Sequence, residues 1–309
     1  AHLHPQLQIR LLKYLESTAR YGNVQIIVTT HSPVLASSVS IETIVQLVKG
    51  ETPQAIALNS CGLSDPSKAF LNRWLDATKS TLLFAKGIIL VEGIAEAMLL
   101  PELAKIVLQD NDKPPKTLED GGVSVINMNG IYFKHFMQLF ADLNENVSIS
   151  IPVRCAGITD NDPPTDSKPI PSSPMPGTNP ALKLKDIVKA SEWARLYSSP
   201  LKTFEYDLAF CGNNIKIMAS VLAGNWPTDG SVKSEIQKLA NKEWSGESEE
   251  NKSEAASEIL ARIEDTHNMG KGLFSQLLAD HIKSGTSIVV PGYIRNAIIW
   301  ACGGNPDES

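Results

Sequence analysis

The stretch Ile88-Ile89-Leu90-Val91-Glu92-Gly93-Ile94-Ala95-Glu96 decides the fold that this sequence predicts. Its apolar run is typical of a buried strand, and a helical pattern from Ile94 to Gln109 follows at once. Glu92 therefore stands at the carboxyl end of a strand, where open α/β sheets bind ligands, and Gly93 allows a tight turn into the helix. Glu96 lies about one helical turn further on, so both carboxylates can face one site.

Two carboxylates held together repel each other unless a proton or a cation lies between them, and hard oxygen ligands suit Mg²⁺ or Mn²⁺. The alternative is that Glu92 caps the helix and Glu96 is solvated. A second acidic set, Thr159-Asp160-Asn161-Asp162, also follows a predicted strand. In an extended backbone Asp160 and Asp162 point the same way and can share a metal. The alternative for this set is an Asx-turn that leads into a proline-rich loop.

The order of elements around these two acidic sets predicts an α/β fold with a parallel sheet flanked by helices. Strands are expected at 87–91, 123–128 and 153–159, with helices at 94–109 and 131–143 between them. Residues 163–180 hold seven prolines and predict an exposed or partly disordered loop. The remaining pattern predicts strands at 24–28, 43–48 and 54–58, and helices at 2–20, 65–85, 181–198, 232–265, 271–283 and 292–301.

The composition argues against binding of nucleic acid or lipid by overall charge, against a zinc module and against a membrane span. The 309 residues carry a net charge of −6, so bulk charge provides no general attraction to nucleic acid or anionic lipid, and phosphate chemistry would need a local device such as bound metal ions. The four cysteines are far apart in sequence, which favours a reduced, cytoplasmic protein without a zinc module. The most apolar stretch, 82–100, is interrupted by charged residues and predicts no membrane span. Because the first residue is Ala, we expect an excised fragment.

The two acidic sets resemble the Toprim domain, the metal-binding module of topoisomerases, primases and some nucleases. The phrase Leu83-Phe84-Ala85-Lys86-Gly87-Ile88-Ile89-Leu90-Val91-Glu92-Gly93 is similar to the start of that domain in the OLD (overcoming lysogenization defect) family of ATP-dependent nucleases. Ala1-His2-Leu3-His4-Pro5 resembles the residues after the Walker B motif of that family's ABC-type ATPase domain, and Thr29-Thr30-His31-Ser32-Pro33 resembles its switch-histidine loop. The sequence contains no Gly-x-x-x-x-Gly-Lys-Ser/Thr phosphate loop.

The resemblance implies a division into three parts: residues 1–60 as the tail of an ATPase domain, 61–84 as a linker helix, and 85–309 as a Toprim domain with a helical insert at about 181–270. His31 would then sense the γ-phosphate of ATP across a dimer, but only in the full-length protein. The segment around Thr203 to Leu208 resembles one that adds a further carboxylate to the metal site, with Glu205 favoured and Asp207 left as the rival. These two acids face alike on a strand but not on a helix.

Lys271, between two glycines, resembles the active-site lysine of the family and could stabilise charge that builds on a scissile phosphate. The leading hypothesis is a DNA endonuclease that hydrolyses phosphodiester bonds with two Mg²⁺ or Mn²⁺ ions about 4 Å apart. One ion would lie nearer Glu92 and Glu96 and the other nearer Asp160 and Asp162. The family further implies dimers and a role in phage defence or DNA processing. Two alternatives stay open: a topoisomerase- or primase-type nucleotidyl transferase, and a non-catalytic regulatory or dimerisation region of an ATPase.

Overall fold

The structure is a computed structural model that describes residues 3–49, 52–109, 115–141 and 149–306. The chain forms two compact units, each interrupted once in sequence. The first contains Ala1–Lys86 and Lys134–Val153, and the second contains Gly87–Phe133 and Arg154–Ser309. Within the described residues, every helix is too short or too polar to cross a membrane.

The first unit combines short helices with one hairpin. Its elements are α1 (Pro5–Gly22), α2 (Pro33–Ala36), the antiparallel strands β1 (Val45–Val48) and β2 (Gln54–Ala57), α3 (Asp65–Trp74) and most of α6 (Phe133–Met137). Short 3₁₀ turns at Ile41–Thr43, Leu58–Ser60 and Lys79–Leu83 connect them. The helix predicted at 2–20 and the strands predicted at 43–48 and 54–58 are confirmed. The helix predicted at 131–143 is only α6, and residues 142 and 143 lie outside the described residues.

Two predictions for this unit are wrong. Residues 24–28 form no strand, and the side chain of Ile27 is 82% exposed. A strand gains its stability from a neighbouring strand, and no described segment pairs with this one. The helix predicted at 65–85 ends at Trp74 because the Asp76 carboxylate accepts the N–H groups of Thr78 and Lys79, which starts a new turn.

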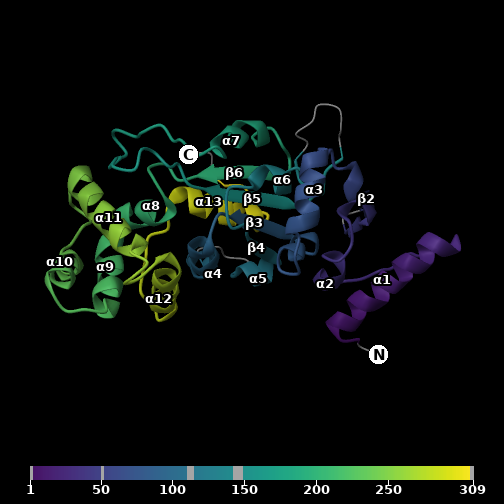
Figure 1. Cartoon of the computed structure of the whole chain (residues 1–309). Coiled ribbons are helices and arrows are strands. Elements are labelled where there is room, and N and C mark those ends of the chain that lie inside the picture. The colour runs from purple at the N-terminus through teal and green to yellow at the C-terminus, as the bar shows by residue number, and fades with distance from the viewer. Residues whose placement is uncertain (1–2, 50–51, 110–114, 142–148, 307–309) are drawn as a thin grey trace. The chain divides into compact units, whose positions relative to one another are not determined.

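The second unit is built on a four-stranded parallel sheet in the order β4-β3-β5-β6 (Figure 1). The parallel sheet and its strands predicted at 87–91, 123–128 and 153–159 are confirmed, whereas β6 was not predicted. The inner strand β3 is buried at every position, and Val91 at its end lies opposite Asn127 of β4 and Ile158 of β5. All four carboxyl ends therefore meet at one edge of the sheet. The strands are β3 (Gly87–Val91), β4 (Val123–Asn127), β5 (Arg154–Thr159) and β6 (Ala194–Ser198).

Helices surround this sheet. Helix α13 packs against β5, β6 and β3, and α12 packs along α4. Their buried side chains join those of the sheet in one apolar core that includes Ile89, Leu103 and Phe274. The helices are α4 (Ile94–Gln109), α5 (Leu118–Gly121), α7 (Leu182–Val188), α8 (Phe204–Phe210), α9 (Asn214–Asn225), α10 (Ser231–Ala240), α11 (Glu249–Glu264), α12 (Lys271–Lys283) and α13 (Gly292–Ala301).

The helix predicted at 181–198 is wrong in its second half. It ends at Val188, and β6 follows as the edge strand of the sheet. In β6 the side chains of Ala194 and Leu196 are buried and Arg195 is half-buried between them, which is the alternation of a strand. Pairing with β5 overrides the helical propensity of Ala, Arg and Leu. The helical stretch predicted at 232–265 is also two helices, α10 and α11, with residues 241–248 between them.

The proline-rich residues 163–180, named the strap below, form a loop that is fixed at several points. The hydroxyl of Tyr206 donates to the carbonyl of Pro169 at 2.8 Å, and Ser172 Oγ donates to Glu249 of α11 at 2.5 Å. At the other end of the strap the Thr178 N–H donates to the carbonyl of Asn161 at 3.0 Å. The strap therefore connects the helical part of this unit to the edge of the sheet.

Candidate active site

Glu92 follows directly after β3 and is fixed across the sheet edge to the end of β5. Its Oε1 accepts the hydroxyl of Thr159, the N–H of Asp160 at 3.1 Å and the side-chain amide of Asn179 at 3.2 Å. Burial raises the pKa of Glu92, and the carboxylate of Asp162 raises it further, whereas these three hydrogen bonds lower it. Glu92 and Asp160 thus lie at the same edge, as the sequence predicted from two separate strands.

Asp160 is the first residue after β5, and its side chain is turned inward. Its Oδ1 accepts the N–H of Phe204, the first residue of α8, at 2.8 Å. Burial holds the pKa of Asp160 well above its ordinary value, and the carboxylates of Glu205 and Glu96 add to the shift. A helix N-terminus stabilises a negative charge at this position, while the neighbouring acids oppose it.

Glu96 lies in the first turn of α4 and is buried, with 6% of its surface exposed. Burial raises its pKa to about 7, and the charges of Glu205 and Glu92 contribute to this shift. The positive charge of Lys271 lowers the pKa of Glu96. Glu96 is therefore not the solvated residue of the alternative reading, because it shares the charge cluster with Glu92.

Glu205 and Lys271 form the ion pair of the site. Helix α8 carries Glu205, which is buried, and its Oε2 lies 3.1 Å from Nζ of Lys271 at the start of α12. Lys271 also lies 3.5 Å from the Glu264 carboxylate. Burial by itself would lower the pKa of Lys271, but the charges of Glu205 and Asp160 outweigh it and raise the pKa above its ordinary value. Lys271 therefore keeps its positive charge inside the cluster.

The segment that carries Glu205 and Asp207 is a helix, so the two acids face different surroundings. The carboxylate of Asp207 accepts the N–H groups of Leu201 at 3.1 Å and Lys202 at 2.9 Å. Burial raises the pKa of Asp207 to about 7. Of the two rivals in the sequence, Glu205 is the one that contacts Lys271, and Asp207 holds the turn before α8.

Asp162 does not have the extended backbone that the sequence analysis assumed. Its φ of 48° is left-handed, so it is not aligned with Asp160 as residues on one face of a strand would be. Its Oδ2 instead accepts the side-chain amide of Asn179 at 2.9 Å. Asn179 is 4% exposed and belongs to the strap, and it was not among the predicted site residues. No local pattern indicates its role, because both of its acidic partners are distant in sequence.

Tyr293, near the start of α13, presents a buried hydroxyl that has no hydrogen-bond partner within the described residues. Burial raises its pKa well above the ordinary value, and the charges of Asp207, Asp160, Glu96 and Glu205 raise it further. The phenol therefore stays neutral. A buried polar atom left without a partner beside carboxylates fits a site that takes up a hydrated cation.

The donor set also fits a divalent cation, because its members are carboxylates whose mutual repulsion one lysine only partly offsets. In the part of the chain that is described, no group of three or more His, Cys, Asp or Glu side chains is arranged to hold a metal ion. Mg²⁺ in enzymes is commonly held by only one or two carboxylates and keeps several waters. Pairs drawn from this cluster are compatible with that coordination.

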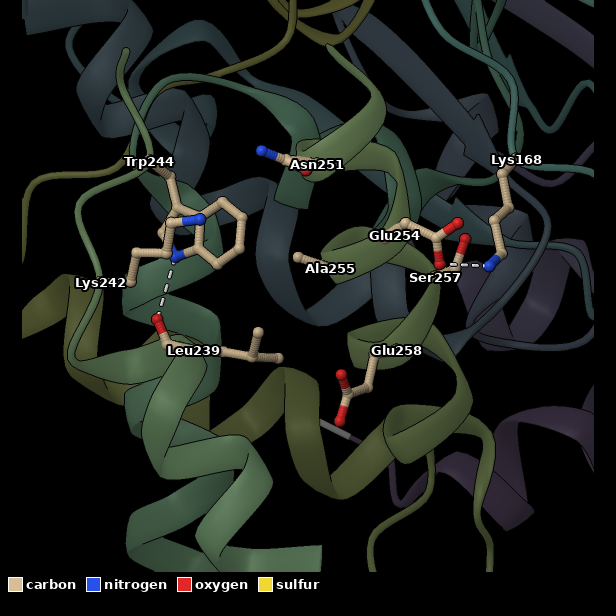
Figure 2. A pocket seen from close by; sticks show the side chains of 9 residues that line it. All are labelled: Lys168, Leu239, Lys242, Trp244, Asn251, Glu254, Ala255, Ser257 and Glu258. Carbon is tan, nitrogen blue, oxygen red and sulfur yellow. Dashed lines mark hydrogen bonds and ion pairs between the residues drawn. The ribbon is translucent and has the colours of Figure 1, made fainter. Parts of the chain in front are cut away.

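Two further features are described separately from the carboxylate cluster. His31 belongs to the first unit and is exposed in the segment before α2. In the second unit a hollow of about 420 Å³ lies between α10, α11 and the strap (Figure 2). Lys168, Trp244 and Glu254 are among its lining residues, and it contains none of the residues predicted for the metal site.

Comparison with known proteins gives two family matches. Residues 83–162 match the model described as "Overcoming lysogenization defect protein-like, TOPRIM domain", and residues 1–36 match the model of an AAA ATPase domain. These matches confirm the resemblance found in the sequence motifs. No curated protein matches the chain.

Solved structures of OLD proteins are also similar. The C-terminal region of the Burkholderia pseudomallei OLD protein is 23% identical, with a TM-score of 0.47 over 71% of this chain and 97% of that one. The C-terminal region of the Xanthomonas campestris pv. campestris OLD protein is 22% identical, with a TM-score of 0.45 over 72% of this chain and 94% of that one.

Proposed function

We propose that this chain, which carries the TOPRIM domain of OLD-like proteins, is a metal-dependent DNA endonuclease that nicks phosphodiester bonds. The observation that carries the proposal is the cluster of buried and half-buried carboxylates at the carboxyl edge of the sheet, where the half-buried Glu92 and Asp160 and the buried Glu205 come from three different elements. Such a concentration of negative charge is costly unless cations neutralise it. It also explains how an acidic protein can act on an anionic polymer, because bound metals invert the local sign of the charge.

Two Mg²⁺ or Mn²⁺ ions would be held by carboxylates of the cluster, with Glu92 and Glu96 nearer one ion and Asp160 and Asp162 nearer the other. When bound, the ions would lower the pKa of a water nucleophile and stabilise the leaving oxygen. Glu205 is the further ligand that we propose, because it contacts Lys271 and its charge raises the pKa of Asp160, whereas the carboxylate of Asp207 accepts two backbone N–H groups.

The residues of this chain prepare the site for that chemistry. The N–H of Asp160 and the hydroxyl of Thr159 fix the orientation of Glu92. Lys271 holds its charge beside Glu205, where it would stabilise the charge that develops on a phosphate in the transition state. Because Glu96 has a pKa of about 7, it can release its proton when a cation arrives near neutral pH.

The ATPase match to residues 1–36 supports a coupling of cleavage to ATP in a longer protein. We propose that His31 contributes to an ATP site that forms only in a full-length dimer. DNA is the proposed partner of the carboxylate cluster, and the cytoplasm the proposed compartment.

The topoisomerase alternative requires a tyrosine that can attack DNA. The hydroxyl of Tyr206 is engaged with the carbonyl of Pro169, and that of Tyr293 is buried. Neither arrangement favours a covalent tyrosine reaction, but Tyr132 is 37% exposed. We propose hydrolysis, and a covalent protein–DNA adduct trapped by denaturation would instead identify the topoisomerase alternative.

Nicking of supercoiled plasmid DNA tests the proposal. The wild-type chain should nick it with Mn²⁺ or Mg²⁺ and lose this activity in EDTA. Glu92→Gln and Asp160→Asn should each lower the rate by about 10²-fold or more, as loss of a metal ligand or of transition-state stabilisation does. Glu119→Gln on the exposed surface of α5 is the matched control. Metal-dependent nicking at the wild-type rate by Glu92→Gln would reject the proposed site.

A further inference from the structure

Asn179 joins two carboxylates that belong to different strands of the sheet. Its Nδ2 lies 3.2 Å from Oε1 of Glu92, which follows β3, and 2.9 Å from Oδ2 of Asp162, which follows β5. A side-chain amide has two N–H donors, so it can serve both acceptors at once without adding charge. The amide thus holds two negative groups near each other that would otherwise repel.

The orientation of this amide is fixed from the other side. Oδ1 of Asn179 accepts the N–H of Ala181 at 2.9 Å, which turns the NH₂ group toward the carboxylates. The preceding Thr178 binds the carbonyl of Asp162 through its N–H at 3.1 Å and through its hydroxyl at 2.5 Å. Gly177 packs so closely that a Cβ there would lie 2.1 Å from Oδ1 of Asn161. The end of the strap is therefore locked against the loop after β5.

Each bridged carboxylate keeps one oxygen for another partner. Within the described residues, hydrogen bonds reach Oε1 of Glu92 and Oδ2 of Asp162, and none reaches Oε2 of Glu92 or Oδ1 of Asp162. The bridge thus fixes the orientation of both groups while it leaves one oxygen of each available. This is the arrangement by which residues behind metal ligands set ligand geometry.

This inference rests on the proposed function: we propose that Asn179 is a positioning residue, which orients Glu92 toward one of the two divalent cations and Asp162 toward the other, and which connects the strap to the metal site. The strap is in turn held by α11, because Ser253 Oγ donates to the carbonyl of Lys168 at 3.1 Å and Lys168 forms an ion pair with Glu254. The position of the Asn179 amide therefore depends on contacts made in the helical part of the same unit.

Mn²⁺ binding to the full chain, followed by the electron paramagnetic resonance signal of free Mn²⁺, tests this role. The informative variant is Asn179→Ser, because a serine hydroxyl can still accept the N–H of Ala181 but cannot bridge both carboxylates. We expect the half-saturating Mn²⁺ concentration to rise about 10- to 100-fold. The melting temperature in EDTA should stay near that of the wild type, and nicking should recover at saturating Mn²⁺. Asn251→Ala, which removes an exposed hydrogen bond from the first turn of α11 to Glu247 in the segment before it, should change neither quantity.

The outcomes separate the two proposals. If the wild-type chain binds no Mn²⁺, both the proposed function and this inference are overturned. If the wild type binds Mn²⁺ and Glu92→Gln weakens binding, but Asn179→Ser binds as the wild type does, only the positioning role is overturned. Should Asn179→Ser not fold, the wild-type protein provides the test through its Asn side-chain amide resonances. One of them should shift on addition of Mg²⁺, and an unchanged set of resonances would overturn the inference.

Discussion

Nζ of Lys271 lies 3.1 Å from Oε2 of Glu205, so an ammonium group from α12 and a carboxylate from α8 form an ion pair at the carboxyl edge of the sheet. The two residues are far apart in sequence, and Glu96 and Asp160 both interact electrostatically with this pair. Removal of the ammonium would leave the buried Glu205 without the cation that now pairs with it. This relationship leads to the first prediction.

Lys271→Met should reduce metal-dependent plasmid nicking by about 10²-fold, because a preorganised positive charge beside the scissile phosphate is lost. The metal-free variant should also unfold more easily, since Glu205 stays buried without its partner. Nicking rates and chemical unfolding in EDTA measure the two effects. Lys283→Met at the exposed end of the same helix is the control and should behave as the wild type does. Full activity of Lys271→Met would remove this residue from the site.

A crossed pair of variants distinguishes Glu205 from Asp207. Glu205→Gln should weaken Mn²⁺ binding and nicking, because its carboxylate pairs with Lys271 and interacts electrostatically with Asp160 and Glu96. Asp207→Asn should keep Mn²⁺ binding but lose about 1–3 kcal/mol of unfolding free energy, because an amide cannot satisfy the N–H groups of both Leu201 and Lys202 as the carboxylate does. Calorimetric Mn²⁺ titrations and urea unfolding provide the comparison. The reverse pattern would make Asp207 the ligand.

These variants decide between Glu205 and Asp207 as the ligand. The sequence left this choice open for a physical reason. Local periodicity predicted α4, α12 and α13 at the bounds that the structure has, since each carries its own apolar pattern. Glu205 and Asp207 point the same way on a strand but not on a helix. The short aromatic segment from Thr203 to Leu208 is compatible with either structure. Only the surrounding packing selects the helix.

Long-range contacts explain the other differences. Strand β6 forms because its backbone pairs with β5, and residues 24–28 form no strand because no described segment pairs with them. The role of Asn179 could not be predicted for the same reason, since its partners Glu92 and Asp162 meet only when the sheet and the strap are in place. The acidic sets themselves could be predicted, because each follows a strand of a parallel sheet and such strands end at one edge.

Glu96 should make the metal-free protein less stable as the pH rises. Its pKa is raised from 4.5 to about 7 in the folded state, so between these values the folded chain holds a proton that the unfolded chain has lost. The stabilisation from Glu96 is therefore complete below pH 4.5 and is lost as the pH rises through about 7. Glu96→Gln imitates the protonated group. It should reduce the change in unfolding free energy over this pH range by up to about 3 kcal/mol.

Urea unfolding in EDTA across this pH range measures the effect, with Glu119→Gln as the exposed control. Addition of Mn²⁺ at the upper end of the range should restore stability to the wild type more than to Glu96→Gln, because only the wild type gains a carboxylate ligand there. Identical pH profiles for Glu96→Gln and the wild type would show that Glu96 titrates normally.

Two glycines, Gly177 in the strap and Gly224 in α9, provide predictions of opposite sign. A Cβ at Gly177 would lie 2.3 Å from the carbonyl oxygen of Asn161 and 2.5 Å from Leu182 Cδ1, so Gly177→Ala must displace the strap. We expect a loss of about 1–3 kcal/mol of unfolding free energy, as for other overpacked positions, together with weaker Mn²⁺ binding because Asn179 moves with the strap.

Gly224, inside α9, has no atom within 4 Å of its Cβ position. Gly224→Ala should therefore stabilise the protein by up to about 1 kcal/mol, because Ala is the better helix former, and leave Mn²⁺ binding unchanged. Chemical unfolding and Mn²⁺ titration of both variants test the pair, and a neutral Gly177→Ala would show that the strap is not locked against Asn161.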